Sequence, residues 1–168
     1  LLDLSQIQSR RLSIEVVPFD ARELLEETLS LMAPLAERRV VDLQFNSDSQ
    51  LPEDLFGDRD RVKQVLINLL DNAIKFTPGG GKVSVSTAST GNIWEINVTD
   101  TGPGVSDSDL PNLFEHFFRG KHSRKFAGSG LGLAIVKEIV ELHQGTVEAF
   151  CPADSGLHVR VRLPRHLT

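Results

Sequence analysis

The chain has 168 residues, of which 40% are hydrophobic and 24% are charged, and its formal net charge is −5. This length allows one domain with a substantial core, and the acidic balance argues against nucleic acid as a partner. The single cysteine excludes an internal disulfide, and no run of about 18 apolar residues indicates a membrane span. Because the chain begins at Leu1 without a methionine or a visible signal peptide, we expect it to be a piece of a longer protein.

The first residues have a helical pattern, since Leu1, Leu4 and Ile7 recur at three-residue steps between polar residues. The pattern fits the end of a longer helix or coiled coil and fits a disordered tail equally well, because it is too short to be stable alone. Residues 12–18 are β-branched and predict a short strand that ends at Pro18.

The next segment has a helix signal followed by a strand signal. Asp20 and Glu23 have capping-box spacing and predict a helix to about Arg38, with Pro34 as a point of kinking or interruption. Residues 40–45 predict a second strand, and residues 46–52 predict a polar loop.

Residues 58–76 predict a helix with an unusual polar face. Asp58 is the expected N-cap, and Asn68, Asn72 and Lys75 follow at i, i+4 and i+7 opposite an apolar face. Carboxamide oxygens suit Mg²⁺, and a lysine one turn away suits a phosphate. Taken alone, the helix is explained equally well by a solvated polar face.

The second half of the chain alternates strand signals with one irregular segment and one helix. The strands are expected at residues 82–88, 93–98, 146–150 and 157–163, the irregular segment at 105–127 and the helix at 133–143. The whole order predicts an α/β fold, a two-layer sandwich in which about three helices cover one face of a mixed sheet.

Two glycine-containing stretches carry candidate chemistry. Asp100, at a strand end before Gly102 and Gly104, could accept a hydrogen bond from an exocyclic amine while the glycines admit a flat ligand. Taken alone, this stretch is better explained as an aspartate-containing β-turn. Residues 128–133, Gly-Ser-Gly-Leu-Gly-Leu, precede a helix and form either a phosphate site or a flexible hinge. Their spacing matches neither the dinucleotide fingerprint nor a Walker loop.

Four stretches in order carry a specific resemblance. They are Asn-Leu-Leu-Asp-Asn-Ala-Ile-Lys at 68–75, Asp-Thr-Gly-Pro-Gly at 100–104, Phe-Glu-His-Phe-Phe-Arg at 114–119 and Gly-Ser-Gly-Leu-Gly at 128–132. Together they resemble the N, G1, F and G2 boxes of sensor histidine kinases, over about residues 14–164. The resemblance implies the Bergerat (GHKL) α/β sandwich. It also implies a dimerisation-helix remnant and linker at 1–13, and a catalytic ATP-binding domain at 14–168 with an ATP lid at about 105–127.

The resemblance implies a role for each residue that matches a motif. Asn72 matches the Mg²⁺ ligand, Asn68 lines the phosphate site, Lys75 reaches the phosphates and Asp100 accepts the adenine amine. Arg119 matches a basic lid residue near the γ-phosphate and is grouped with Asn68 and Lys75 as catalytic. The further implied nucleotide contacts are Thr101 (through water), Gly102, Gly104, Phe117, Lys121, Gly128, Ser129, Gly130, Leu131 and Gly132, and the implied lid anchors are Phe114, Phe117 and Phe118.

The resemblance further implies ATP and Mg²⁺ as cofactors and phosphoryl transfer to a histidine on the dimerisation domain of the same protein, which this sequence lacks. The phosphoryl group would pass to an aspartate of a response-regulator receiver domain. We expect a homodimeric full-length protein, a monomeric isolated domain and a cytoplasmic location for this domain. Many family members are anchored in the inner membrane, and the sequence leaves open whether this full-length protein is. His116 departs from the family, which more often has Pro or Arg there.

Two other functions compete with this one. The first is an ATPase or a serine/threonine kinase of the same fold. A water-activating ATPase would have a glutamate where this chain has Asn68. The second is a nucleotide-sensing interaction module without transfer activity, for which His116 leaves room. Away from the motifs, the position of His143 at a helix C-terminus favours a protonated imidazole through the helix dipole.

Overall fold

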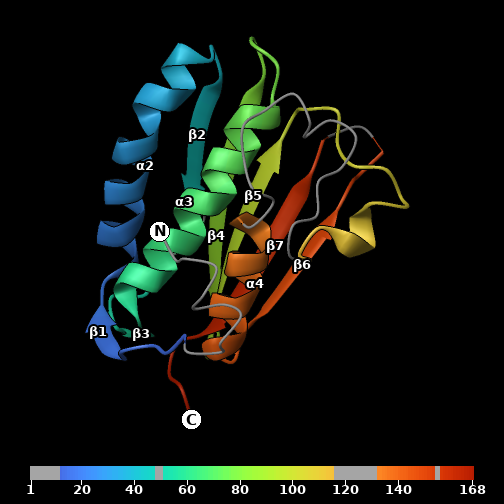
Figure 1. The fold of residues 1–168 in the computed structure, drawn as a ribbon. Coiled ribbons are helices and arrows are strands. Elements are labelled where there is room, and N and C mark those ends of the chain that lie inside the picture. The colour runs from blue at the N-terminus through green and yellow to red at the C-terminus, as the bar shows by residue number, and fades with distance from the viewer. Residues whose placement is uncertain (1–11, 48–50, 116–131, 154–155) are drawn as a thin grey trace.

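In the computed structural model the described residues, 12–47, 51–115, 132–153 and 156–168, form a five-stranded sheet with helices on one face (Figure 1). The strands are β2 (Asp42–Ser47), β4 (Lys82–Thr90), β5 (Ile93–Asp100), β6 (Thr146–Phe150) and β7 (His158–Pro164). Their order is β2-β4-β5-β7-β6. The β2–β4 pair is parallel and the other pairs are antiparallel, so the expected mixed sheet is confirmed.

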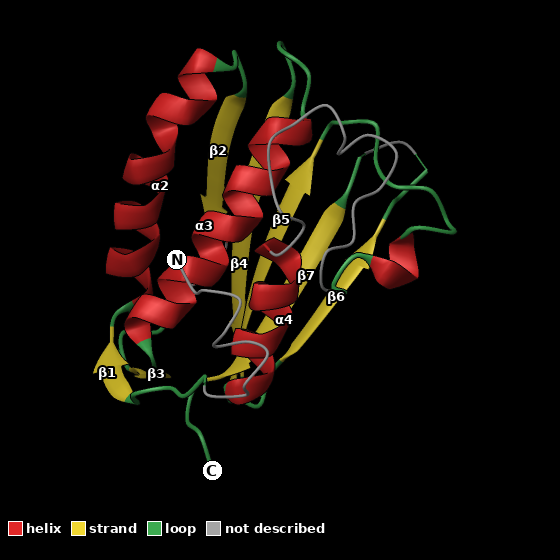
Figure 2. Ribbon diagram, viewed as in Figure 1, coloured by secondary structure: helices red, strands yellow, loops and turns green. Residues whose placement is uncertain are grey.

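Three helices make the second layer of the sandwich: α2 (Ala21–Arg38), α3 (Arg59–Phe76) and α4 (Gly132–Leu142). They lie side by side against one face of the sheet (Figure 2), as the sequence predicted. The expected break at Pro34 does not occur, because Met32 and Ala36 on either side are buried and packing holds α2 together across the missing hydrogen bond. None of the helices in the described ranges is both long and apolar enough to cross a bilayer.

A second, two-stranded sheet forms beside the start of α3. Its strands are β1 (Val17–Phe19) and β3 (Leu55–Gly57), which pair antiparallel. The strand expected at 12–18 is therefore shorter and begins later, and the strand at 55–57 was not expected. Three residues are too few to establish an alternating pattern, so the sequence carries no periodic signal for either strand.

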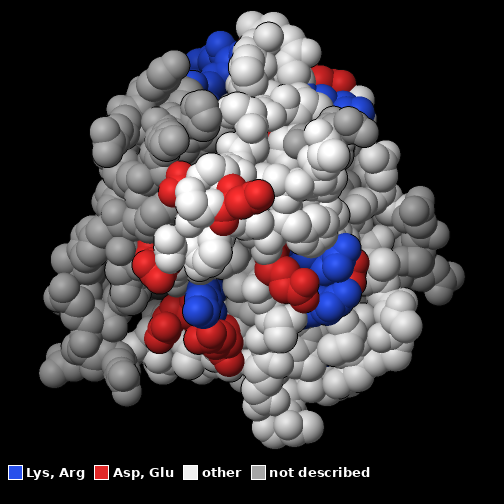
Figure 3. Space-filling model, turned by 90° about the vertical axis from the view of Figure 1, so that its right-hand side faces the viewer, with Lys and Arg blue, Asp and Glu red and all other residues white. Residues whose placement is uncertain are grey.

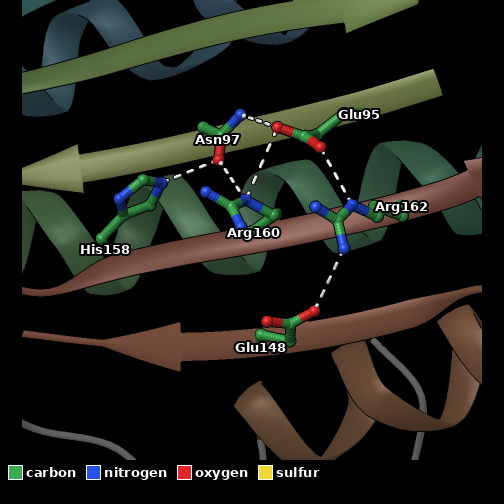
Figure 4. Close-up of polar contacts among 6 residues, drawn as sticks. All are labelled: Glu95, Asn97, Glu148, His158, Arg160 and Arg162. Atoms are coloured by element: carbon green, nitrogen blue, oxygen red, sulfur yellow. Dashed lines mark hydrogen bonds and ion pairs between the residues drawn. The ribbon is translucent and has the colours of Figure 1, made fainter. Parts of the chain in front are cut away.

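The two faces of the main sheet differ in polarity. Alternate residues of the central strands, among them Val85, Ile96 and Val161, point toward the helices and are buried in a single core. The intervening residues of β5, β6 and β7 point to the other face, where six polar side chains interact (Figure 4). They are Glu95, Asn97, Glu148, His158, Arg160 and Arg162.

Glu95 is the centre of this outer polar group. Its carboxylate accepts hydrogen bonds from Asn97 Nδ2 at 2.9 Å and from Arg162 Nε at 2.9 Å. The Asn97 hydrogen bond, then that of Arg162 and the charges of Arg160 and Arg162, lower the pKa of Glu95 against the opposing effect of burial. Seen from the side of the β6 edge, acidic and basic side chains stand in small groups, some mixed and some of one sign, with uncharged surface between them (Figure 3).

Candidate functional site

Helix α3 presents the three polar residues of the predicted phosphate site. Its opposite face is buried against the sheet, which leaves Asn68, Asn72 and Lys75 half-buried on the second face. Asn68 Nδ2 donates to the carbonyl oxygen of Gly132 at 3.2 Å, so this face meets the start of α4 although the two residues lie 64 positions apart. Lys75 Nζ lies 2.9 Å from Asp71 Oδ2 on the preceding turn, so its ammonium stays next to the helix.

Asp100 ends β5 as one of the few buried acidic groups of the described chain. It is 4% exposed, and its Oδ1 accepts the backbone N–H of Gly102 at 2.9 Å and of Leu157 at 3.2 Å. Burial raises the pKa of this carboxyl group, while the two backbone hydrogen bonds act in the opposite direction. Among the described residues no side-chain cation pairs with it, and both hydrogen bonds go to Oδ1. Oδ2 is therefore available as an acceptor for a ligand amine.

The loop after Asp100 is built so that backbone comes close to backbone. A Cβ at Gly102 would lie 2.6 Å from the carbonyl oxygen of Phe76, the last residue of α3. Gly104 has a φ of +72° and would place a Cβ 3.3 Å from Cys151 Sγ. Both glycines are thus required by the local geometry, the first by space and the second by its left-handed backbone. Together they bring the predicted adenine loop to the end of the asparagine-bearing helix.

Thr101 closes the same loop by a different contact. Its Oγ1 accepts the backbone N–H of Lys82 at 2.9 Å, which ties the end of β5 to the start of β4. The hydroxyl proton remains free to donate to a water or a ligand. The predicted water bridge from Thr101 to adenine stays a prediction.

Two residues that the sequence did not single out complete the surroundings of Asp100. Gly156 N donates to the Asp100 carbonyl oxygen at 3.1 Å, and the Asp100 N–H donates to Leu157 O at 3.0 Å. A Cβ at Gly156 would collide with Asp100 Oδ1 and lie 2.8 Å from Gly102 N. The only sequence signal was a glycine before an expected strand, which is too common to identify a site.

Several predicted site residues lie outside the described residues. They are Phe117, Arg119, Lys121, Gly128, Ser129, Gly130 and Leu131, together with His116 and Phe118. Of the predicted lid, residues 105–115 are described and contain a short 3₁₀ helix, η1 (Leu110–Asn112). Phe114, a predicted lid anchor, is half-buried and packs against the core.

His143 differs from its expected state. It is 2% exposed, its Nδ1 lies 2.8 Å from Ile139 O, and its Nε2 lies 2.9 Å from Asp58 N. A carbonyl oxygen can only accept and a backbone N–H can only donate, so Nδ1 carries the proton and Nε2 does not. The imidazole is therefore neutral, and the expectation of a protonated His143 is wrong. These two hydrogen bonds prevail over the helix dipole because the ring is buried.

The donor set limits what metal the site can hold. Within the described ranges, no three His, Cys, Asp or Glu side chains come together in an arrangement suited to a metal ion. Asn72 supplies one neutral oxygen at most. Mg²⁺ is commonly held by one or two protein ligands together with substrate phosphates and water. The residues present therefore fit a cation that arrives with a phosphate ligand and do not fit a resident metal.

Comparison with known proteins adds independent findings. The profile of the family described as histidine kinase-, DNA gyrase B-, and HSP90-like ATPase matches residues 57–167. The chain is 38% identical to the sensor protein SphS of Synechococcus elongatus, over 98% of this chain and 42% of that protein. It is 37% identical to the signal transduction histidine-protein kinase BaeS of Escherichia coli, over 98% of this chain and 35% of that protein. It spans less than half of each of these relatives.

Solved structures agree with the sequence matches. A mycobacterial sensor histidine kinase, MprB, superposes with a TM-score of 0.77 at 31% identity, over 90% of this chain and all of that one. Full-length ShkA, solved in complex with AMPPNP, superposes with a TM-score of 0.81 at 29% identity, over 94% of this chain and 32% of that one. The two-layer fold is thus shared with both proteins, of which MprB is named as a sensor histidine kinase.

Proposed function

The chain belongs to the histidine kinase-, DNA gyrase B-, and HSP90-like ATPase family, and on that premise we propose that it serves a sensor histidine kinase as its ATP-binding catalytic domain. The observation that carries the proposal most directly is the state of Asp100. The carboxylate is buried, one of its oxygens accepts two backbone N–H groups, and the other has no hydrogen-bond partner among the described residues, so it is suited to receive an amine. Adenine offers such an amine, and Gly102 and Gly104 leave backbone surface for its ring.

The phosphates lie, in this proposal, between α3 and the start of α4. Asn68 already bonds to Gly132, so a triphosphate placed there would meet the carboxamide of Asn72 and the backbone at the positive end of α4. Lys75 would exchange its exposed pair with Asp71 for a phosphate oxygen, which costs little because such pairs contribute about 1 kcal/mol or less. Arg119 and Lys121, outside the described residues, add positive charge in this proposal.

The proposed reaction moves the γ-phosphoryl group of ATP to an imidazole nitrogen of a dimerisation domain of the same protein. The bond from the γ-phosphorus to the bridging oxygen breaks, a phosphorus–nitrogen bond forms, and ADP leaves with the electron pair. Asn72 would hold a Mg²⁺ ion that arrives with ATP, and the ion would then neutralise charge on the phosphates. The chain's own residues orient the adenine ring and place the triphosphate in line with the nucleophile.

The polar face of α3 favours transfer over hydrolysis. An ATPase needs a base that removes a proton from water, and a carboxamide has no useful proton affinity at neutral pH. Asn68, one turn before Asn72, has such a carboxamide, and its nitrogen is engaged by Gly132. The lack of a base at this position favours a nucleophile that needs no activation by Asn68, such as the imidazole of a histidine, over water.

The partners follow from the same proposal. The phosphorylated histidine would pass its phosphoryl group to an aspartate of a response-regulator receiver domain. The full-length protein would be a homodimer through its dimerisation helices, and the isolated domain a monomer. An inner-membrane anchor elsewhere in the full-length protein would leave this domain in the cytoplasm.

The first test is calorimetric titration of the chain with a non-hydrolysable ATP analogue, with and without Mg²⁺. We expect saturable binding at a one-to-one ratio and tighter binding with the metal. A folded chain that does not bind the analogue contradicts the proposal. Adding labelled ATP and a separately produced dimerisation domain then tests transfer. Label on its histidine supports the kinase, whereas nucleotide binding without label supports a sensing module.

Asn72→Ala tests the metal assignment. The substitution removes the only proposed protein oxygen on Mg²⁺, so we expect the gain in affinity that the metal gives the wild-type chain to disappear. Gln64 offers a matched carboxamide two turns earlier on the same helix, about 12 Å along its axis, so Gln64→Ala is the control and should keep the metal-dependent gain. If metal improves the affinity of Asn72→Ala as it does that of the wild type, the ligand lies elsewhere.

A further inference from the structure

His143 joins two helices for which the described residues show one other polar contact, between Asn68 and Gly132, beside apolar packing. Its ring projects from the C-terminal end of α4 to the residue that starts α3, where Nε2 accepts the Asp58 N–H at 2.9 Å. The ring fits closely, since a Cβ at Gly57 would lie 2.9 Å from His143 Cδ2 and 3.0 Å from Nε2. This joint is separate from every residue that the proposed function assigns to nucleotide.

Asp58 is held from three directions at this point. Its Oδ1 accepts the N–H of Arg61 in the first turn of α3, and its Oδ2 accepts the N–H of Glu15, just before β1. Its own N–H goes to His143. Both carboxylate oxygens and the N–H of Asp58 are thus hydrogen-bonded, which holds the start of α3 in place. The imidazole of His143, at the end of α4, is one of these three partners.

The end of α4 that carries His143 is also held in place. After His143 the chain turns through Gln144, which has a φ of +60°, and Gly145, where a Cβ would collide with Arg162 O of β7. The Gly145 N–H also closes the helix by donating to Val140 O at 2.9 Å. The imidazole therefore connects the start of α3 to a helix end that is seated on the sheet.

Helices α3 and α4 run antiparallel (Figure 1), and their two polar contacts lie at the two ends of α4, one at the start of α3 and the other near its middle. Asp58 and Asn68 are ten residues apart on α3, about 15 Å along the axis, and His143 and Gly132 are eleven residues apart on α4, about 17 Å. The nearly equal spans mean that both contacts fit a single register of α4 along α3, with the His143 contact at the end of α4 remote from Gly132. The Gly132 end faces Asn68 and Asn72, the proposed phosphate site.

We propose that His143 is a positioning residue for the phosphate site, which sets the register of α4 along α3 through the Asp58 N–H. This inference rests on the proposed function. Losing the contact lets the start of α4 drift from Asn68 and Asn72 and weakens the hold on phosphates. The hydrogen bonds to the Asp100 carboxylate come from Gly102, just after β5, and Leu157, just before β7, and neither residue belongs to α4. The hold on adenine is therefore unaffected.

The test compares two amides that differ by one methylene. The amide of His143→Gln reaches about as far as Nε2 and keeps an acceptor for the Asp58 N–H, whereas that of His143→Asn reaches only as far as Nδ1 and leaves the N–H unpaired. Affinities for a non-hydrolysable ATP analogue with Mg²⁺ are measured by calorimetry, and those for adenosine by the NMR shift of the Gly102 amide. Glu141→Gln, on the exposed face of α4, is the control.

We expect His143→Asn to bind the ATP analogue about tenfold more weakly while its affinity for adenosine stays within about twofold of the wild type. His143→Gln should recover the affinity for the analogue to within about threefold, and Glu141→Gln should match the wild type for both ligands. A purely structural role would lower both affinities together or neither. Either of these results for His143→Asn overturns the inference.

A second variant covers the case in which His143→Asn does not fold. Gly57→Ala pushes its Cβ against the ring and should give the same selective loss of affinity for the ATP analogue. Unchanged relative affinities in Gly57→Ala, with an unfolded His143→Asn, overturn the inference. Failure of the proposed function is seen separately, because the wild-type chain would then not bind the ATP analogue at all.

Discussion

Two carboxylates on the same strand, Asp100 and Glu95, have opposite surroundings. Asp100, at the end of β5, is buried and contacts only backbone N–H groups among the described residues. Glu95, five residues earlier on the outer face, is surrounded by Asn97, Arg160 and Arg162. Burial raises the pKa of Asp100, whereas the Asn97 hydrogen bond and the arginines lower the pKa of Glu95.

The difference separates a binding group from a structural one. The hydrogen-bonding capacity of Glu95 is used by its neighbours, which stabilises the open face of the sheet and leaves little for a ligand. Asp100 is kept at some cost to stability, with one oxygen unused, which is the state expected of a residue retained for binding. The same residue class in one strand thus has two functions, and the partners of each carboxylate tell them apart.

The largest expected effect comes from Asp100→Asn. The amide keeps an acceptor for the Gly102 and Leu157 N–H groups but presents a donor to the ligand amine, so affinity for an ATP analogue should fall on the order of a hundredfold. Thermal unfolding should show a fold that is at least as stable, since an ionised buried group is removed. Glu95→Gln is the matched control and should bind like the wild type. Equal losses of affinity in the two variants would erase the distinction drawn here.

Gly156→Ala should have an intermediate effect. The added methyl collides with Asp100 Oδ1 and approaches Gly102 N, so the carboxylate has to move. We expect a loss of about 1–3 kcal/mol in the free energy of unfolding, as for other overpacked sites, together with weaker nucleotide binding. Chemical denaturation and calorimetry measure the two effects. Gly79→Ala, in the turn after α3, is a control for stability alone, because its added Cβ makes only ordinary contacts, at 3.5 Å from Arg39 O and 3.8 Å from Val40 Cβ.

The smallest effect is the pH dependence of stability. A lowered pKa means that Glu95 stabilises the fold above the ordinary glutamate pKa of 4.5 and that this contribution is lost as the pH falls through its lower folded value. Glu95→Gln should therefore be about 1 kcal/mol or less below the wild type at neutral pH and converge with it in acid.

The contribution of Asp100 to stability changes with pH in the opposite direction. Its raised pKa means that any stability is fully present below the ordinary aspartate pKa of 3.8 and is lost as the pH rises through the folded value. Asp100→Asn should therefore gain stability on the wild type as the pH rises through that window. Denaturation curves across the acid range measure both differences. A shift of the same sign for the two variants would contradict the assigned environments.

The sequence predicted the parts of the fold that repeat. Helix α3 has eighteen residues with a consistent apolar face, and β4, β5 and β7 alternate over seven residues or more, so pattern alone located them. The pair β1–β3 has three residues per strand and gives no such signal. Its position follows from contacts with the C-terminal residues, such as the Phe56 N–H to Arg165 O, which lie far away in sequence.

In the candidate site, too, residues in local motifs could be predicted from the sequence, and residues placed by distant contacts could not. Asp100, Gly102 and the asparagines of α3 stand in local motifs whose spacing could be recognised. Gly156 matters only because β7 lies beside β5, and His143 is neutral only because Asp58 comes to meet it. Both facts depend on pairings between distant segments, which composition and spacing do not encode. The assignments to residues 116–131 stay predictions.

The segment between Asp100 and Gly132 is anchored at both ends, which affects how its length and sequence can change in evolution. The chain leaves the sheet at Asp100 and returns to the helical layer at Gly132, and both points are anchored, by Leu157 and by Asn68. Closing a longer connection between fixed ends costs only about 0.6 kcal/mol for each doubling of its length. Insertions and deletions between these anchors that spare the packed residues 101–114 are therefore thermodynamically cheap. The segment proposed to cover the nucleotide can diverge in length and sequence while the sheet and the base-binding end stay as they are.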